Sequence, residues 1–281
     1  MVLHNTTADT YNLKGYIVGN GATDWDYDVS PSFPRTVYGF NLVPHDYIEY
    51  LEANDCVYYF NDFKPHSGPE GCDAVWNKTQ ELTTSLNWYD LYQPASANPL
   101  SAVPRNASAM VNGVEKHYLR GKKRSEYTPW IKHLLSDEND VVTGMTLSDY
   151  LNNATVRTAL NIPDSAPGWD MCSSTLDYHV QPEASLWIYE ILKVNGIRIL
   201  FYSGDTDGAV PTYGTKRWIK DLNWPVKTEW TQWHSDGQVA GYLTKYDGLD
   251  FLTVKGAGHM APQEKRKAVQ TQIFAFLTND L

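Results

Sequence analysis

The last third of the chain alternates between segments with helical and with strand periodicity, and this order constrains the fold more than any other feature. It first predicts a helix ending at Asn195-Gly196, a strand over 198–202 and a helix over 213–222. A hairpin of strands 229–233 and 240–244 follows, with its turn at Asp236-Gly237. The last two elements are a strand over 250–254 and a helix over 263–277. Such alternation is typical of an α/β fold with a mainly parallel sheet.

Earlier segments are less regular. Residues 13–18 predict a buried strand that ends in a tight turn at Gly19-Asn20-Gly21. Helical spacing is visible over 47–51, and the segment 147–160 predicts one amphipathic helix. Residues 93–130 contain several prolines and predict a surface connection between two subregions.

Composition excludes several classes of protein. A formal net charge of -10 argues against nucleic-acid binding, and no apolar run reaches the length of about 18 residues that a membrane-spanning helix needs. Aromatic residues make up 13% of the 281 positions, which is too many for a disordered chain. The first residues show neither the basic segment nor the apolar run of a signal peptide.

Polar side chains follow two of the predicted strands at their carboxyl ends. The segments 202–211 and 254–262 each run from an apolar strand into a glycine-containing turn, and together they carry an acid and a histidine. Taken singly, such a turn is usually only a turn, and a lone histidine is usually structural. At neighbouring strand ends, however, the acid can accept a hydrogen bond from one imidazole nitrogen and leave the other to act as a general base.

Other kinds of site are disfavoured. Residues 256–261 satisfy the dinucleotide-binding pattern G-x-G-x-x-A, but a single predicted helix follows and no later strand carries an acid for the ribose. The sequence contains no C-x-x-C, H-E-x-x-H or Walker pattern, and its histidines lack metal-ligand spacing. No cofactor and no metal site are therefore predicted.

Four segments resemble the serine carboxypeptidases (peptidase family S10), which are secreted, lysosomal or vacuolar enzymes with the α/β-hydrolase fold. They are 13–24 (L-K-G-Y-I-V-G-N-G-A-T-D), 199–211 (I-L-F-Y-S-G-D-T-D-G-A-V-P), 233–246 and 251–262 (F-L-T-V-K-G-A-G-H-M-A-P). The similarity is weakest over about 54–130. The resemblance implies one partial α/β-hydrolase domain over 1–281, with a variable helical insertion or lid at about 40–130.

The resemblance also implies roles for individual residues. Asp207 would be the catalytic acid and His259 the base, with Asp205 as a structural neighbour and Met260 beside the leaving group. The implied reaction is hydrolysis of the C-terminal peptide bond of peptides or proteins by a Ser-Asp-His triad. The implied location is a lysosome, a vacuole or the outside of the cell.

The family's nucleophile motif G-E-S-Y-A-G and its loop W-x-N-G-G-P-G-C-S-S are both missing from these residues. No serine has glycine at both -2 and +2, and Ser173, Ser203 and Ser235 are poor substitutes. We therefore expect a C-terminal portion of the fold that supplies the acid and the base only and is inactive alone. Its partner would be the missing N-terminal portion, and its first strand would leave an apolar edge exposed.

Three alternatives stay open. The chain is part of a serine carboxypeptidase, part of an acyltransferase of the same superfamily, or a non-catalytic pseudoenzyme. A homodimer is possible, and neither nucleic acid nor membrane is expected as a partner.

The glycosylation sequons suggest a secretory protein, and the cysteines agree with a missing N-terminal portion. Cys56 and Cys72 are candidates for a disulfide with each other, whereas Cys172 resembles the family cysteine whose partner lies in the missing loop. The basic run 122–124 falls where several family members are cleaved into two chains. The four sequons begin at Asn5, Asn77, Asn106 and Asn153.

Overall fold

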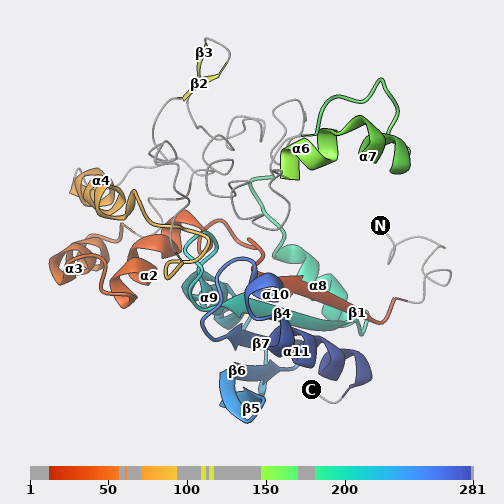
Figure 1. Ribbon diagram of the computed structural model, residues 1–281. Helices are drawn as coiled ribbons and strands as arrows, with labels where there is room; N and C mark the ends of the chain where they lie inside the picture. Colours follow the sequence, from red (N-terminus) through yellow and green to blue (C-terminus); the bar gives the residue numbers. More distant parts are fainter. Residues whose placement is uncertain are drawn as a thin grey trace.

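A five-stranded sheet forms the centre of the protein (Figure 1). The computed structural model describes residues 13–56, 61, 71–93, 109–111, 114–116, 147–169 and 181–279. The strands are β1 (Gly15–Gly19), β4 (Arg198–Gly204), β5 (Val226–Ser235), β6 (Gln238–Tyr246) and β7 (Leu249–Val254), and their order is β1-β4-β7-β6-β5. β4 pairs in parallel with both β1 and β7, whereas β6 and β5 continue the sheet antiparallel.

Helices cover both faces of the sheet, and the alternation of side chains along β4 explains how. Ile199 and Phe201 pack with α8 (Trp187–Val194) and α9 (Thr212–Asp221), whereas Leu200 packs with α10 (Ala261–Glu264) and α11 (Arg266–Thr278). Successive side chains of a strand point to opposite faces of the sheet. A strand with apolar side chains on both faces therefore needs helices packed against both faces. The arrangement is therefore three-layered, as expected for an α/β fold.

A second hydrophobic core lies to one side of the sheet (Figure 1). It is built on the helices α2 (Phe33–Gly39), α3 (His45–Ala53) and α4 (Gly71–Thr83), and the 3-10 turn η1 (Ser30–Ser32) directly precedes α2. The Cys56–Cys72 disulfide links the end of α3 to α4 and is completely buried. We call the described part of residues 33–92 the helical insertion.

Four shorter elements complete the described part of the chain. β2 (Ala109–Val111) and β3 (Val114–Lys116) form an antiparallel pair, and α6 (Leu147–Asn152) precedes α7 (Ala154–Ala159). No helix in the described ranges is long and apolar enough to cross a bilayer.

The predicted strands, the hairpin turn and the helix ending at Asn195 are confirmed, but two helix predictions are wrong in detail. The segment 147–160 is two helices, because Asn153 caps α7 by accepting a hydrogen bond from the Thr155 backbone N–H at 2.9 Å. The segment 263–277 is likewise divided, since α10 ends before Lys265. α2 and α4 lie outside the segments for which the sequence predicts a helix, since α2 is short and has Pro34 in its first turn, and more than half of the buried residues of α4 are polar.

Candidate active site

Two loops meet at the carboxyl ends of β4 and β7, where the chain turns out of neighbouring parallel strands. Their approach depends on Gly204, since a Cβ there would lie 2.1 Å from the carbonyl oxygen of Gly258. The loops are also joined by backbone hydrogen bonds, including one from the Thr206 N–H to the Ala257 carbonyl at 2.9 Å. The register of the sheet thus places the two sequence segments with an acid and a histidine side by side.

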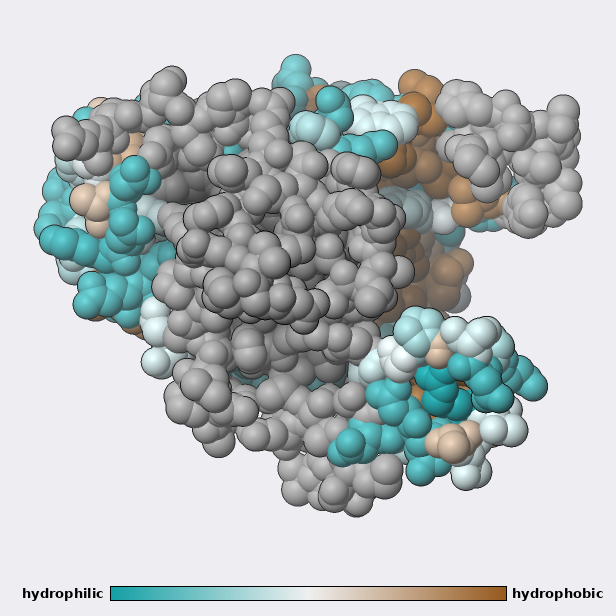
Figure 2. Space-filling model, turned by 90° about the horizontal axis from the view of Figure 1, so that it is seen from above, coloured by the Kyte–Doolittle hydropathy of each residue, from teal (hydrophilic) through white to brown (hydrophobic). Residues whose placement is uncertain are grey.

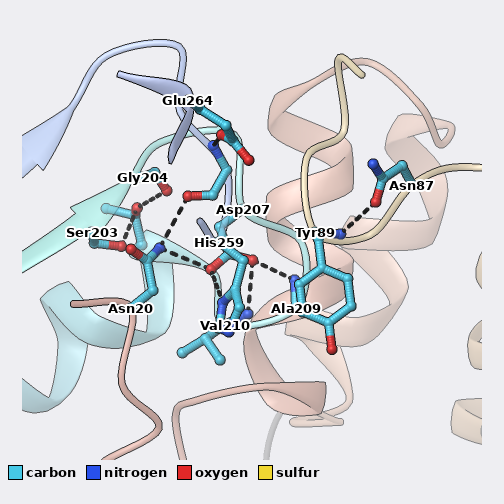
Figure 3. Close-up of polar contacts among 12 residues, drawn as sticks. Asn20, Asn87, Tyr89, Ser203, Gly204, Asp207, Ala209, Val210, His259 and Glu264 are labelled. Carbon is cyan, nitrogen blue, oxygen red and sulfur yellow. Dashed lines mark hydrogen bonds and ion pairs between the residues drawn. The ribbon is translucent and has the colours of Figure 1, made fainter. Parts of the chain in front are cut away.

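Asp207 and His259 form a hydrogen-bonded pair at this junction (Figure 3). The His259 Nδ1 atom lies 2.8 Å from Asp207 Oδ2, and their side chains are 29% and 0% exposed. The other carboxylate oxygen, Oδ1, accepts hydrogen bonds from the backbone N–H groups of Ala209 at 2.7 Å and Val210 at 3.0 Å. With Oδ2 as acceptor, the Nδ1 atom carries the proton, so Nε2 is left as the basic nitrogen.

Asn20 is a third member of this group that sequence reasoning missed. Its Nδ2 donates to Asp207 Oδ2 at 2.9 Å, the same oxygen that faces the imidazole (Figure 3). Asn20 directly follows β1 and has a left-handed φ of 47°, and this turn of the backbone brings its side chain to Asp207. The turn Gly19-Asn20-Gly21 marked the position, but nothing local showed that its amide would meet an acid from β4.

Two further carboxylates hold the loops in place. Asp205 Oδ1 accepts from the Gly256 N–H at 2.6 Å, which agrees with its expected structural role, and burial raises the pKa of this carboxyl. Glu264 on α10 accepts from the Gly258 N–H. Burial, followed by the charges of Asp90 and Asp207, raises the pKa of Glu264 as well.

Asp28 is a buried acid close to the same group. Its Oδ2 accepts from the backbone N–H groups of Thr23 at 2.7 Å and Asp24 at 3.0 Å. Complete burial, with smaller contributions from the charges of Asp24 and Asp207, raises its pKa from 3.8 to about 7. The Oδ1 atom of Asp28 has no protein partner, so nothing there offsets the cost of a buried charge.

No hydrogen bond in the described part of the chain joins the remaining predicted residues to the pair. Met260 follows His259 and is the N-cap residue of α10. Ser203 is buried and bonded to Thr212 at 2.7 Å, and it shows no contact with His259 that would suit a nucleophile. Asn77 is exposed on α4, and Asn153 is exposed at the start of α7. Asn5, Asn106, Cys172, Ser173 and the basic run 122–124 fall outside the described residues.

Among the described residues, no group of three or more His, Cys, Asp or Glu side chains could hold a metal ion. The chemistry that the described geometry can perform is proton transfer by an imidazole held by a buried carboxylate.

A family model described as serine carboxypeptidase matches residues 2–279. A serine carboxypeptidase-like 26 protein of Oryza sativa subsp. japonica is 32% identical over 277 residues, which cover 96% of this chain and 54% of the relative. A serine carboxypeptidase of Caenorhabditis elegans is 30% identical and is aligned over 95% of this chain and 58% of its own length.

The crystal structure of a prohormone-processing carboxypeptidase from Saccharomyces cerevisiae has the same fold, with a TM-score of 0.63 at 19% identity over 99% of this chain and 56% of that one. The chain therefore spans about half the length of the relatives it matches. With the family model aligned to nearly all of its residues, the chain belongs to the serine carboxypeptidase family.

Proposed function

We propose that this chain supplies the acid and the base of a serine-type carboxypeptidase, which hydrolyses C-terminal peptide bonds of peptides and proteins. The observation that carries the proposal is the 2.8 Å contact between the fully buried Asp207 carboxylate and the half-buried His259 imidazole. Burial keeps water from competing for the carboxylate, while partial exposure leaves the imidazole open to a substrate.

In this reaction, His259 Nε2 accepts the proton of a serine hydroxyl as the serine oxygen attacks the scissile carbonyl. The imidazolium then returns that proton to the leaving amino group, and an acyl-enzyme remains. Water, deprotonated by the same nitrogen, hydrolyses the acyl-enzyme and regenerates the serine. The Asp207 carboxylate holds the imidazole in place and stabilises the imidazolium.

We further propose that the nucleophilic serine belongs to an N-terminal portion of the fold, which packs alongside β1. Within the described ranges β1 pairs with one strand, β4, at the end of the sheet order. Tyr16 on β1 and the adjacent Leu13 are each 41% exposed. Figure 2 shows apolar atoms gathered in a recess at one side of the molecule, as a surface that receives another layer of the fold would have.

The test is the release of C-terminal amino acids from N-blocked dipeptides at acidic and neutral pH. We expect no turnover by the 281 residues alone, because no serine in their sequence lies in the family's nucleophile motif. A longer chain that includes the nucleophile-bearing portion should be active, and His259→Ala should lower its kcat by about 10³-fold or more. His45→Ala, at an exposed position on α3, is the matched control and should leave kcat unchanged.

Other outcomes would contradict the proposal. Turnover by the 281 residues that survives His259→Ala would remove the pair from the mechanism. A longer chain that transfers acyl groups to small alcohols, without releasing amino acids from peptides, would identify an acyltransferase. No reaction of the longer chain with a serine-directed fluorophosphonate would identify a pseudoenzyme.

We also propose that the protein matures in the secretory pathway and works in a lysosome, a vacuole or the extracellular space. The Cys56–Cys72 disulfide suits an oxidising compartment, and Asn77 and Asn153 are exposed sequon residues. Treatment with an amidase that removes N-linked glycans should lower the apparent mass of the protein from eukaryotic cells. Asn77→Gln with Asn153→Gln should reduce that change, and an unchanged mass would contradict the proposal.

A further inference from the structure

We propose that residues 87–92 of the helical insertion, which we call the brace segment, position both members of the Asp207–His259 pair, and that Asp90 is its positioning residue. The inference rests on the proposed function of the pair. It goes further in assigning a part in the active site to the segment through which the helical insertion contacts the loops at the end of the sheet. The segment falls in the region where the sequence showed least similarity to the family.

Two local side-chain contacts shape the brace segment. Asn87 Oδ1 accepts from the Tyr89 N–H at 3.0 Å, and Asp90 Oδ1 accepts from the Tyr92 N–H at 3.0 Å. Each is a turn in which an Asn or Asp side chain bonds to the backbone two residues on. The Trp88 indole N–H donates to the Thr83 carbonyl at 3.0 Å, which fastens the segment to the end of α4. With these turns, carbonyl and N–H groups of the brace segment face the loops that carry Asp207 and His259.

On the acid side, the brace segment holds both sequence neighbours of Asp207. The Gly208 N–H donates to the Trp88 carbonyl at 2.8 Å. The Leu91 N–H donates to the Thr206 carbonyl at 3.0 Å. The Thr206 hydroxyl donates to Asp90 Oδ1 at 2.8 Å, and both residues are 3% exposed. The residues immediately before and after Asp207 are therefore both held by the brace segment.

On the base side, the brace segment holds the backbone and the ring of His259. The His259 N–H donates to the Tyr89 carbonyl at 2.6 Å. The Tyr89 ring meets the imidazole edge-on, with ring centroids 5.0 Å apart and an interplanar angle of 66°. One short segment thus contacts the acid and the base through different groups, which fixes the distance between them.

Gly258 and Gly208 lie in the loops that carry His259 and Asp207, and they allow the brace segment to come close to both loops. A Cβ at Gly258 would lie 2.0 Å from the Tyr89 carbonyl oxygen and 2.5 Å from Asp90 Cβ. A Cβ at Gly208 would lie 2.9 Å from the Trp88 carbonyl oxygen. Both loops thus leave room for the brace segment, and a side chain at Gly258 would push it away from the imidazole.

Asp90 is the residue whose side chain joins the brace segment to the acid loop. Its Oδ1 accepts from the Tyr92 N–H inside the segment and from the Thr206 hydroxyl outside it. The Asp90 charge also raises the pKa values of Asp205 and Glu264, so these carboxylates lie within its electrostatic reach. Loss of the Thr206 contact would free the backbone one residue before Asp207 and loosen the carboxylate against His259.

The test is proton and nitrogen NMR of His259 in the 281-residue chain, with its signals assigned by comparison with His259→Ala. The readouts are the Nδ1–H resonance and the imidazole pKa, neither of which requires turnover. We expect Asp90→Ala and Thr206→Val each to weaken the Nδ1–H resonance and to lower the proton affinity of His259 by about tenfold, as the Asp207 carboxylate loosens. Asp90→Asn keeps the Oδ1 acceptor and should stay within about threefold of the parent.

The variants separate positioning from charge. If the Asp90 charge alone matters, Asp90→Asn will behave like Asp90→Ala and Thr206→Val will have no effect, which would overturn the inference. Should Asp90→Ala fail to fold by circular dichroism, Thr206→Val, which keeps the size of the side chain, decides the question. A parent chain whose Nδ1–H resonance is insensitive to Asp207→Asn would instead refute the Asp207–His259 pair, and with it the proposed function.

Discussion

At the scale of single residues, the buried acids near the active site differ in their hydrogen-bond partners. Asp207 is buried but receives N–H donors on both oxygens, whereas Asp28 has one oxygen without a protein partner. Hydrogen bonds to a carboxylate favour its charged form, and burial without them favours the neutral form. The two neighbouring acids therefore differ in how completely their buried oxygens are paired.

Asp28 predicts a pH dependence of stability. Because its pKa rises from 3.8 to about 7 on folding, the folded state binds the proton more tightly than the unfolded chain does. The free energy of unfolding should therefore fall as pH rises from about 4 to about 7, by an amount on the order of a few kcal/mol. In urea titrations across this range, Asp28→Asn should flatten the fall, since the amide oxygen still accepts from Thr23 and Asp24.

Glu81→Gln, at an exposed position on α4, is the control for this pH series and should follow the parent. A parent protein whose stability rises from pH 4 to 7, with the same slope in Asp28→Asn, would contradict the assignment.

Gly258 predicts a steric cost. Gly258→Ala places a methyl group 2.0 Å from the Tyr89 carbonyl oxygen, so the two backbones must move apart, and we expect a loss of about 1–3 kcal/mol in unfolding free energy. Gly39→Ala is the control, because a Cβ there meets nothing within 4 Å. Urea denaturation of the two variants should separate them, and equal stabilities would show that the loops are not in close contact.

At the scale of elements, the helical insertion is a small unit that relies on its own core and one covalent link. Phe33, Trp76 and Trp88 form edge-to-face and tilted aromatic contacts at its centre, with centroids 6.2 Å and 4.8 Å from Phe33. The same unit ends in the brace segment. Its stability is thus connected with the geometry of the active site.

We predict that removing the disulfide of the helical insertion destabilises the insertion and loosens the brace segment. Cys56 and Cys72 are 16 positions apart, and a loop of that length restricts the unfolded chain enough to stabilise the fold by about 3 kcal/mol. Cys56→Ala with Cys72→Ala should lower the melting temperature and increase hydrogen exchange in α4 and in residues 87–92. The single variant Cys172→Ala is the control, and unchanged exchange in the double variant would show that the insertion does not need the link.

At the scale of the whole molecule, the sheet ends at β1 with a surface that is only partly covered by the described residues. Every position of β1 is intermediate or exposed, whereas β7 is almost completely buried. A strand at the end of a sheet offers backbone groups for pairing with a further strand. The same surface that would receive the proposed N-terminal portion therefore favours association between copies of this chain.

We predict that the 281 residues self-associate and that Tyr16→Lys shifts the population toward the monomer. Tyr16 is 41% exposed on β1, and a lysine there opposes edge-to-edge pairing through charge. Leu82→Lys, at a 53% exposed position on α4, is the control. Sedimentation velocity over a range of concentrations measures the effect, and an equal shift in both variants would show that general surface hydropathy, rather than β1, governs association.

The sequence by itself determined the elements whose signals are local. The apolar runs that became β4 and β7 each end in a glycine-containing turn, so Asp207 and His259 could be placed at strand ends from their own neighbourhoods. The resemblance to the family then distinguished Asp207 from Asp205. Capping was also locally encoded, yet the amide of Asn153 was overlooked and one helix was predicted where two exist.

Only the tertiary structure decided which distant groups complete the site. Asn20 meets Asp207 across 187 positions, and the Asp90 carboxylate meets Thr206 across 116, so neither contact leaves a periodic or local trace in the sequence. The raised pKa of Asp28 likewise follows from burial, which the residue type does not reveal. A side chain's propensity acts over a few residues, whereas its partners and its exposure to water are set by how the sheet and the helical insertion pack together.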